Sequence, residues 1–434
     1  MIIINNKIYN YIVFSIILLF PLFYVIGSLF LNLLVVLTIL MTILSYNKEN
    51  KEHLFLFLKK YKYFILTSLT LVAINVINSQ IKNYSTIKVI SYLRFFIFPL
   101  CYIFLISKLS NKSLKQITYF YFFLISFVIV DSLIQLIFGK DIFGFPYFEP
   151  YKRITGPFGD EMIVGFFLLN IGVLTVSFLN YFNLIKIKTN FYILVILSIS
   201  ILLTGERSSF ISFLIFLFFL FIFSNHKKII ILTSFVVVIL SLILIKSLSF
   251  LDNKYPIYKL LDVSVAVDEN KKNSNSINSI EKNSNTGSLN NYIPIYKWTG
   301  HFERSFEIIE KHYLFGSGFR TYRYICFEYQ KKYYQSKNIH KCSIHPHNFH
   351  LEILSDNGIL GYLAFVVFIV YIIFKIYKKN NNNNFGISII FCLILSFIFP
   401  LKTTGSIFTT NFAFIFWYLV ANYLFLLKKT KNIS

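Results

Sequence analysis

The chain has 434 residues, with 42 Lys and Arg against 19 Asp and Glu, so its formal net charge is +23. Hydrophobic residues make up 56% and charged residues 14%, whereas a soluble domain carries roughly 25% charged residues. Apolar runs of about 18 or more residues, each long enough to cross a bilayer, recur along the chain. Together these features exclude a soluble enzyme and a protein with a single membrane anchor. The four cysteines exclude a disulfide scaffold.

Twelve apolar runs predict an all-α, polytopic membrane protein with about twelve transmembrane helices. They lie at about Tyr11–Ile26, Leu29–Tyr46, Tyr63–Ser79, Val89–Ser107, Thr118–Phe138, Met162–Phe182, Asn190–Thr204, Ser208–Ser224, Ile229–Phe250, Gly358–Tyr377, Gly386–Leu401 and Ile407–Leu427. Only Gly205, Glu206 and Arg207 join the seventh run to the eighth. We therefore expect these two runs to form a helical hairpin with a tight turn.

The distribution of basic residues predicts the orientation of the chain. With the N-terminus inside, nineteen lysines fall in inner connections and tails, against seven basic residues in short outer connections. Because cytoplasmic loops are enriched in Lys and Arg, this split predicts that both termini are cytoplasmic. It also explains the net positive charge without a nucleic-acid partner.

Three regions follow from this topology: residues 1–250 with nine helices, an outer loop at 251–350, and residues 351–434 with the last three helices. Within the loop, Asp268–Asn291 is rich in Asn, Ser and Lys and has almost no apolar residues, so we expect it to be disordered. Aromatic residues return from Tyr292 onward, which predicts that residues 292–350 fold on the membrane surface as part of a catalytic region.

Four histidines crowd into the segment HKCSIHPHNFH, His340–His350. Imidazole and the Cys342 thiol are good transition-metal ligands, but the spacing matches no common metal motif and Pro346 imposes an extended junction. Pro346 also suits the first position of a helix, which predicts His347 in its first turn. There the helix dipole would keep imidazole neutral, and a neutral His can act as a general base. A structural histidine bonded to the backbone is the alternative.

Two arginines predict anion binding on the outer face. Arg207, in TGERSSF, lies at the outer end of two apolar helices, where an unpartnered charge is costly. Arg320 follows the glycine-rich turn of LFGSGFRTYR, whose backbone amides we expect to face an anion as well. Contact with lipid phosphate is the alternative for each arginine. Together with His347, they suggest an anionic, lipid-linked substrate that is handled by a base.

Weaker candidates lie elsewhere on the outer side. Arg153 and Asp160 lie on an outer loop that could hold a sugar, and Lys297 and Arg304 lie where a phosphate contact is expected. Cys326 and Cys342 could pair if the compartment is oxidising, but the sequence does not determine whether they do. Arg94 and Lys246 fall inside predicted spans and are expected to face the protein interior or to snorkel. Cys101 and Cys392 also fall inside spans and are expected to be small apolar fillers.

The sequence resembles the O-antigen ligase and polysaccharide polymerase superfamily of bacterial envelope glycosyltransferases. The ligase pattern is His, then Asn, Ser or Gln, nine residues, Gly, two residues, and Gly, Thr or Tyr. His347, Asn348, Gly358 and Gly361 match it. The family also has an arginine at the end of a helical hairpin, like Arg207, and a Gly-x-Gly turn before the His helix, like Gly316–Gly318. Twelve spans with a large outer loop before the tenth complete the resemblance.

The resemblance implies an inverting, metal-independent glycosyl transfer that needs no cofactor, on the periplasmic side of the bacterial inner membrane. The donor would be a glycan on undecaprenyl pyrophosphate, and the acceptor a sugar hydroxyl on lipid A-core or on another repeat unit. By position, His347 would be the base, Arg207 a pyrophosphate ligand and Asn348 a substrate contact. The family's second arginine, before a Trp, has no match in IPIYKWTGHFERS, so Lys297, Arg304 or Arg320 is expected to replace it.

Within the superfamily the sequence favours a ligase slightly over a polymerase, and a protein O-oligosaccharyltransferase shares the same helix. A transporter of the lipid-linked glycan is the alternative from another class, and it would require polar breaks midway through several spans. A scaffold of an envelope synthesis complex would need neither His347 nor Arg207.

Overall fold

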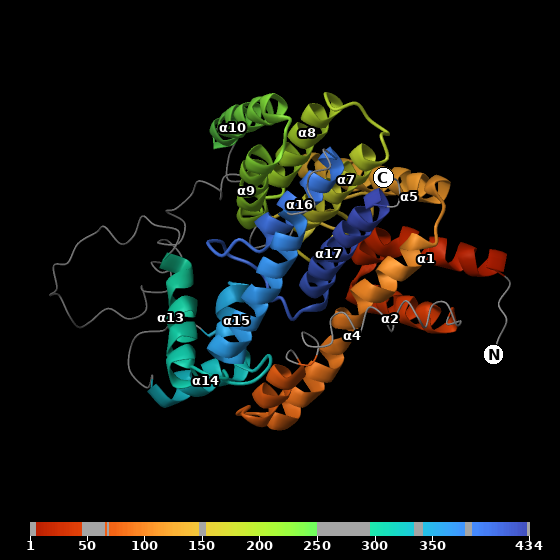
Figure 1. The fold of residues 1–434 in the computed structure, drawn as a ribbon. Coiled ribbons are helices and arrows are strands. Elements are labelled where there is room, and N and C mark those ends of the chain that lie inside the picture. The colour runs from red at the N-terminus through yellow and green to blue at the C-terminus, as the bar shows by residue number, and fades with distance from the viewer. Residues whose placement is uncertain are drawn as a thin grey trace, which may run out of the picture.

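The computed structural model describes residues 6–45, 66, 69–146, 153–249, 296–333, 342–377 and 384–431. The chain is helical throughout these parts (Figure 1), and one isolated bridge joins Lys140 to Pro146. The helices are α1 (Asn6–Ile26), α2 (Ser28–Leu44), α4 (Lys82–Ser107), α5 (Asn111–Phe138), α6 (Val164–Phe167), α7 (Val173–Tyr181), α8 (Thr189–Leu203), α9 (Arg207–Phe223), α10 (Lys227–Ser249), α13 (Tyr296–Lys311), α14 (Tyr322–Tyr333), α15 (Phe349–Tyr377), α16 (Phe385–Phe397) and α17 (Thr410–Lys431).

The described residues contain seven helices long and apolar enough to cross a membrane, and four shorter apolar helices. The all-α membrane fold is therefore confirmed, while the number twelve stays a prediction. Most predicted runs fall on a helix, and part of the third lies outside the described residues. The eleventh run was placed too long: α16 ends at Phe397, and the chain from Ile398 to Thr409 forms a loop instead.

Buried hydroxyl and amide groups in the bundle core pair with one another. The Tyr121 hydroxyl lies 2.6 Å from the Ile17 carbonyl oxygen and 2.6 Å from the Tyr418 hydroxyl, and the Tyr102 hydroxyl donates to Asn422 Oδ1 at 3.0 Å. These contacts join α1, α4, α5 and α17. An unsatisfied polar group in an apolar interior is costly, so this pairing fixes how the four helices meet.

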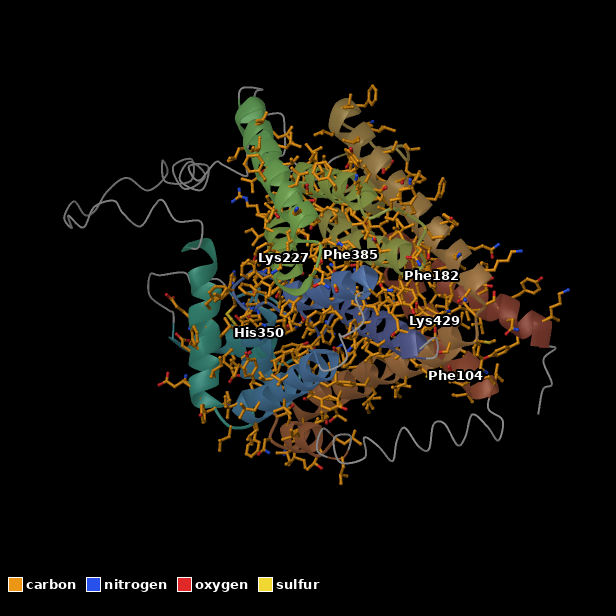
Figure 2. The ribbon with its side chains drawn as sticks, turned by 45° about the horizontal axis from the view of Figure 1, so that its top comes forward. Phe104, Phe182, Lys227, His350, Phe385 and Lys429 are labelled. Carbon is orange, nitrogen blue, oxygen red and sulfur yellow. A yellow bond between two sulfur atoms is a disulfide. The ribbon has the colours of Figure 1, made fainter. Side chains whose placement is uncertain are left out.

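The outer surfaces of the bundle are apolar and exposed, as expected of helices that face lipid. On α10, for example, Leu232, Phe235 and Leu242 are exposed. Two of the lysines predicted to be cytoplasmic lie over aromatic rings: Lys108 Nζ is 4.2 Å from the centroid of Phe104, and Lys429 Nζ is 5.7 Å from that of Phe182. Figure 2 shows Phe104, Phe182 and Lys429 on the side of the bundle away from α13.

The described part of the predicted outer loop forms two helices beside the bundle. α13 packs against the first half of α15, and α14 packs against α13 (Figure 1). The structure answers whether Cys326 and Cys342 pair, which the sequence left open: their disulfide joins α14 to the segment that leads into α15. The stretch expected to be disordered, Asp268–Asn291, lies outside the described residues.

Candidate functional site

The segment that carries His347 ends at the N-terminus of α15. Asn348 caps this helix, because its Oδ1 accepts hydrogen bonds from the backbone amides of His350 (2.9 Å) and Leu351 (3.1 Å). His347 precedes the cap and has a φ of 54°, so the expectation that it lies in the first helical turn is wrong. The helix begins at Phe349, three residues after the Pro346 expected at its first position, because the Asn348 side chain supplies the cap.

The glycines of the two sequence motifs meet at one joint. α15 is broken at Gly358, where φ is 65° and ψ is −174°, so residues 349–357 form a short helix of their own. The amides of Ser317 and Gly318 donate to the carbonyl oxygens of Ser355 (2.9 Å) and Asp356 (3.0 Å), which this break leaves without helical partners. The expectation that the amides of the glycine turn face an anion is therefore wrong: they hold the end of the short helix.

Glycine is required at this joint because the two backbones touch. A Cβ at Gly358 would lie 2.4 Å from the Leu314 carbonyl oxygen, and a Cβ at Gly316 would lie 2.3 Å from the carbonyl of Asp356. The residues of the ligase pattern therefore do not lie on one continuous helix: His347 precedes it, and Gly358 interrupts it.

Three imidazole rings cluster ahead of α15. The centroid of His347 lies 4.3 Å from that of His345 and 5.1 Å from that of His301, which belongs to α13. Burial, and then the neighbouring His345 and His301, lower the pKa of His347 to about 3. Burial, and then His301 and Arg323, lower the pKa of His345 to about 4. His347 is thus neutral at pH 7, as expected, but burial and crowding cause this and not the helix dipole. Among the described residues, no three His, Cys, Asp or Glu side chains are arranged to hold a metal ion.

The loop between α16 and α17 holds the His347 segment in place. The Asn348 side-chain amide donates to the carbonyl oxygens of Pro400 (2.7 Å) and Lys402 (3.2 Å), and the Thr404 amide donates to the His347 carbonyl (2.8 Å). His350 also contacts this region, with Nε2 2.8 Å from the Ile398 carbonyl oxygen. Because a carbonyl only accepts, His350 Nε2 carries the proton. Asn348 and His350 therefore position His347.

Lys402 connects this loop to the helix that begins at Arg207. Its Nζ is buried and donates to Ser212 Oγ at 3.0 Å and to the Ser396 carbonyl oxygen at 2.6 Å. Burial lowers the pKa of Lys402 to about 7. Since Ser212 lies in the second turn of α9, the contacts run from α9 through Lys402 and Asn348 to His347.

Arg207 is the first residue of α9, and the predicted hairpin with α8 is present. The preceding Glu206 fixes the turn: its carboxylate accepts from the amides of Gly165 (2.8 Å) and Phe166 (3.0 Å) and from Ser209 Oγ (2.8 Å). Burial raises the pKa of Glu206, while these hydrogen bonds and the charge of Arg153 oppose the rise. The structure thus brings Arg153 within electrostatic range of the turn that presents Arg207.

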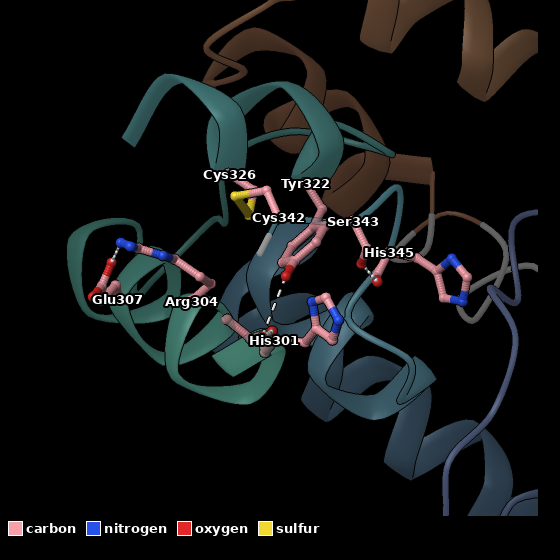
Figure 3. The surroundings of a disulfide bond; sticks show 9 residues. His301, Arg304, Glu307, Tyr322, Cys326, Cys342, Ser343 and His345 are labelled. Atoms are coloured by element: carbon pink, nitrogen blue, oxygen red, sulfur yellow. Dashed lines mark hydrogen bonds and ion pairs between the residues drawn. A yellow bond between two sulfur atoms is a disulfide. The ribbon is translucent and has the colours of Figure 1, made fainter. Parts of the chain in front are cut away.

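The three candidates for a second cation have different surroundings. Arg320 lies within electrostatic range of His345. Arg304 is 1% exposed and bonds Glu307 at 2.6 Å on the side of α13 away from His345, as Figure 3 shows. Lys297 is on α13, and its side chain lies outside the described residues. Arg320 is therefore the candidate that the structure brings to the histidines.

Residues 192–366 match the family model described as O-antigen ligase. The matched segment contains the turn with Arg207, the helices α13 and α14, and the whole ligase pattern from His347 to Gly361. This segment belongs to the O-antigen ligase and polymerase superfamily. The comparison with curated proteins found no significant match.

The match of this segment supports a function of the O-antigen ligase or polymerase type in general, and the apolar helices support a multi-pass membrane protein. The matched ligase pattern acquires a structural explanation: Asn348 starts a short helix, Gly358 ends it, and the nine residues between them set its length. The glycine turn holds the far end of this helix, and the α16–α17 loop holds the near end. The histidine of the ligase motif is thus fixed from two directions.

Sequence reasoning missed the buried acids beside this site. Glu352 and Asp356 are each almost fully buried in the short helix; Ser406 Oγ donates to Glu352 Oε1 at 2.6 Å, and the Tyr322 amide donates to Asp356 Oδ1 at 2.8 Å. Two carboxylates close together in a chain with few acids could have indicated a site, because a buried acid needs hydrogen-bond partners. Those partners are 54 and 34 residues away in the chain, so the sequence alone does not identify them.

Proposed function

We propose that the protein is an O-antigen ligase-type glycosyltransferase that moves a glycan from undecaprenyl pyrophosphate to a sugar hydroxyl on lipid A-core. It would act on the outer face of the bacterial inner membrane, with both termini cytoplasmic. The observation that carries this proposal is the state of His347: a neutral imidazole, fixed ahead of a capped helix within the segment that matches the ligase family.

In the proposed reaction, the acceptor hydroxyl oxygen attacks the anomeric carbon of the donor sugar from the face opposite the phosphate. The new glycosidic bond forms as the bond from the anomeric carbon to the phosphate oxygen breaks, so the configuration inverts. His347 takes the hydroxyl proton, and undecaprenyl pyrophosphate leaves with the bonding electron pair. No metal or cofactor is required.

A base with a pKa of about 3 is weak, but the bound donor would change this value. An anionic pyrophosphate next to the ring stabilises imidazolium and raises its pKa. The lowered pKa keeps His347 unprotonated before the donor arrives, and the donor's own charge then makes proton transfer more favourable. Catalysis thereby depends on donor binding.

Arg207 is proposed to bind the donor pyrophosphate and to stabilise the charge on the leaving group. Its planar guanidinium suits phosphate, and Glu206 fixes the backbone that presents it. Arg153, near the same turn, is proposed to contact the donor glycan. Arg320 supplies a cation beside the histidines on another element, and it is proposed to contact a phosphate.

The test is genetic. A strain lacking the gene would carry wild-type protein, His347→Ala, Arg207→Ala or the control His312→Ala, and its surface polysaccharide would be separated on a gel. His312 is a histidine at the far end of α13, so its loss should leave the ladder intact. Bare lipid A-core with undecaprenyl-linked polymer in the first two variants supports the ligase.

The same gel identifies the alternatives. If the variants give lipid A-core capped with single repeat units, the protein is a repeat-unit polymerase of the same superfamily and not a ligase. A normal ladder from both variants, with protein levels equal by blot, would remove the catalytic role of His347 and direct attention to transport of the lipid-linked glycan.

A further inference from the structure

Four cationic side chains converge where α4 meets the beginning of α14. Lys88 and Arg94 lie on α4, Arg320 precedes α14, and Arg323 is in its first turn. The two elements are in direct contact: the rings of Tyr84 and Tyr324 are 4.8 Å apart, and the Gln80 amide donates to the Ser317 carbonyl oxygen at 3.0 Å. Both Lys88 and Arg94 lie within electrostatic range of Arg320, and Lys88 also of Arg323.

This cationic cluster (Lys88, Arg94, Arg320 and Arg323) has no ion-pair partner within 4.0 Å in the part of the chain that the structure describes. Two of its members lie over aromatic rings: Lys88 Nζ is 5.1 Å from the centroid of Tyr84, and the Arg94 guanidinium is 5.0 Å from that of Phe95. The Nε atoms of Arg94, Arg320 and Arg323 are buried and make no hydrogen bond within that part of the chain.

The acids nearest to the cluster have other partners. Glu352 and Asp356 feel the charge of Arg320, but Glu352 accepts from Ser406 and Asp356 accepts from the Tyr322 amide. The four like charges repel one another, and the buried Nε groups of the three arginines have lost hydration without gaining a hydrogen bond. An anion with several oxygens would remove both costs. Arginine forks favour phosphate, which accepts hydrogen bonds in pairs.

The cluster lies next to the proposed base. His345 is within electrostatic range of Arg320 and Arg323, and its ring centroid is 4.3 Å from that of His347. Arg207, by contrast, begins α9, and Figure 1 shows α9 and α14 apart, with α15 between them. The proposed base therefore has one group of cations at α14 and another cation at α9. Two phosphate-bearing substrates, a donor and an acceptor, would require two such groups.

We propose that the cationic cluster binds a phosphate group of the acceptor, so that the acceptor is a phosphorylated glycolipid whose hydroxyl reaches His347 from the α14 side. This inference rests on the proposed function, in which Arg207 binds the donor pyrophosphate. It assigns Lys88, Arg94 and Arg323 to a substrate site and gives Arg320 a specific substrate.

The test measures binding separately from transfer. Purified full-length protein would be titrated with bisphosphorylated lipid A, with monophosphoryl lipid A, with undecaprenyl pyrophosphate and with phosphatidylglycerol, by native mass spectrometry. The variants are the triple Lys88→Gln/Arg94→Gln/Arg323→Gln and the control Lys82→Gln, an exposed cation at the start of the same helix. We expect the triple variant to bind bisphosphorylated lipid A about tenfold or more weakly, and undecaprenyl pyrophosphate as the wild type does.

Each other outcome overturns the assignment. Weaker undecaprenyl pyrophosphate binding alone would make the cluster part of the donor site. Equal competition by phosphatidylglycerol would make it a contact for bulk lipid headgroups. The charge-preserving variant Lys88→Arg should retain binding, and its failure to do so would indicate a packing defect instead of a lost phosphate contact.

The His347→Ala variant separates the two proposals. It should bind every lipid normally while transfer is lost. If His347→Ala transfers glycan normally but the triple variant still loses bisphosphorylated lipid A, the proposed catalysis is wrong and the phosphate site stands.

Discussion

The chemistry of the site depends on a histidine whose proton affinity is lowered by its surroundings. Burial and two neighbouring imidazoles hold the pKa of His347 near 3, well below the ordinary value of 6.5. Folding keeps this histidine neutral, so below pH 6.5 the folded protein binds fewer protons than the unfolded chain. Acidification through this range therefore disfavours folding, but it leaves the folded base unprotonated.

The first prediction is a pH profile without a histidine-like loss of activity. Between pH 7.5 and 5.5, kcat/KM, which reports the free enzyme, should not fall with an apparent pKa near 6.5, because His347 is already neutral. Transfer would be measured with purified protein over short times at each pH, with melting temperatures as a control for unfolding. A decline centred near pH 6.5 in folded protein would contradict the lowered pKa.

The second prediction concerns Glu206, which fixes the turn before Arg207. Glu206→Gln replaces one carboxylate oxygen with an amide that cannot accept from Phe166 or Ser209, so a buried donor loses its partner. We expect a loss of about 1–3 kcal/mol in stability, together with reduced transfer. Thermal unfolding in detergent measures the first effect. Glu328→Gln, at an exposed position on α14, is the matched control and should leave the melting temperature unchanged.

For single residues, the sequence predicts which side chains are candidates for function, but not which residues surround them in the fold. A charge at the end of two apolar helices identified Arg207, and the ligase pattern identified His347. Neither could reveal that Glu206 caps α6, some 40 residues earlier, or that His301 of α13 lies beside His347. Such contacts depend on how distant helices pack, which local spacing does not specify.

Among the structural elements, the joint between the glycine turn and the broken helix α15 determines where the His347 helix ends. The third prediction is that Gly358→Ala abolishes or strongly reduces transfer, because its Cβ would lie 2.4 Å from the Leu314 carbonyl oxygen at a φ of 65°. Gly144→Ala is the control: its φ is 88°, but nothing lies within 4 Å of the added Cβ. Both variants carry backbone strain, so a defect confined to Gly358→Ala measures the steric contact. Equal defects would argue against the joint.

The fourth prediction concerns the disulfide that ties α14 to the His345 segment. Cys326 and Cys342 are 16 residues apart, and closing a loop of that size stabilises a fold by roughly 3 kcal/mol in the chain-entropy model. Cys326→Ser/Cys342→Ser should therefore lower stability and kcat together, because His345 and His347 follow directly. A reducing agent should reproduce the effect in wild-type protein and do nothing to the double variant, whose remaining cysteines are buried.

The apolar runs predicted helices far better than they predicted helix ends. α10 was placed within a few residues, because continuous hydrophobicity needs no knowledge of its neighbours. The start of α15 was misplaced because Pro346 suits the first position of a helix, whereas the Asn348 cap starts the helix at Phe349. The end of α16 was misplaced because Phe399 and Leu401 continue the apolar run into a loop whose carbonyls bind Asn348 and His350.

For the whole molecule, the proposed chemistry requires that the histidine cluster and both groups of cations face the same side of the membrane. The chain's charge distribution predicts this, since the outer connections are poor in lysine. The structure is compatible with it: α4 begins beside α14, and the lysines expected to be cytoplasmic include Lys108, at the other end of α4. The described helices do not by themselves determine the number of crossings.

The fifth prediction tests this sidedness with single cysteines. The native chain is a favourable background, because Cys101 and Cys392 are buried and the other two cysteines form the disulfide. In intact cells with a permeabilised outer membrane, a maleimide that cannot cross the inner membrane should label Ile142→Cys and Tyr313→Cys, which are exposed and predicted to be outside. Asn111→Cys and Ile187→Cys should be labelled only after lysis, since both are predicted to be cytoplasmic. Labelling of Ile187→Cys in intact cells would place the α8–α9 hairpin in the opposite orientation, and Arg207 would then face the cytoplasm, where it could not serve a base on the outer face.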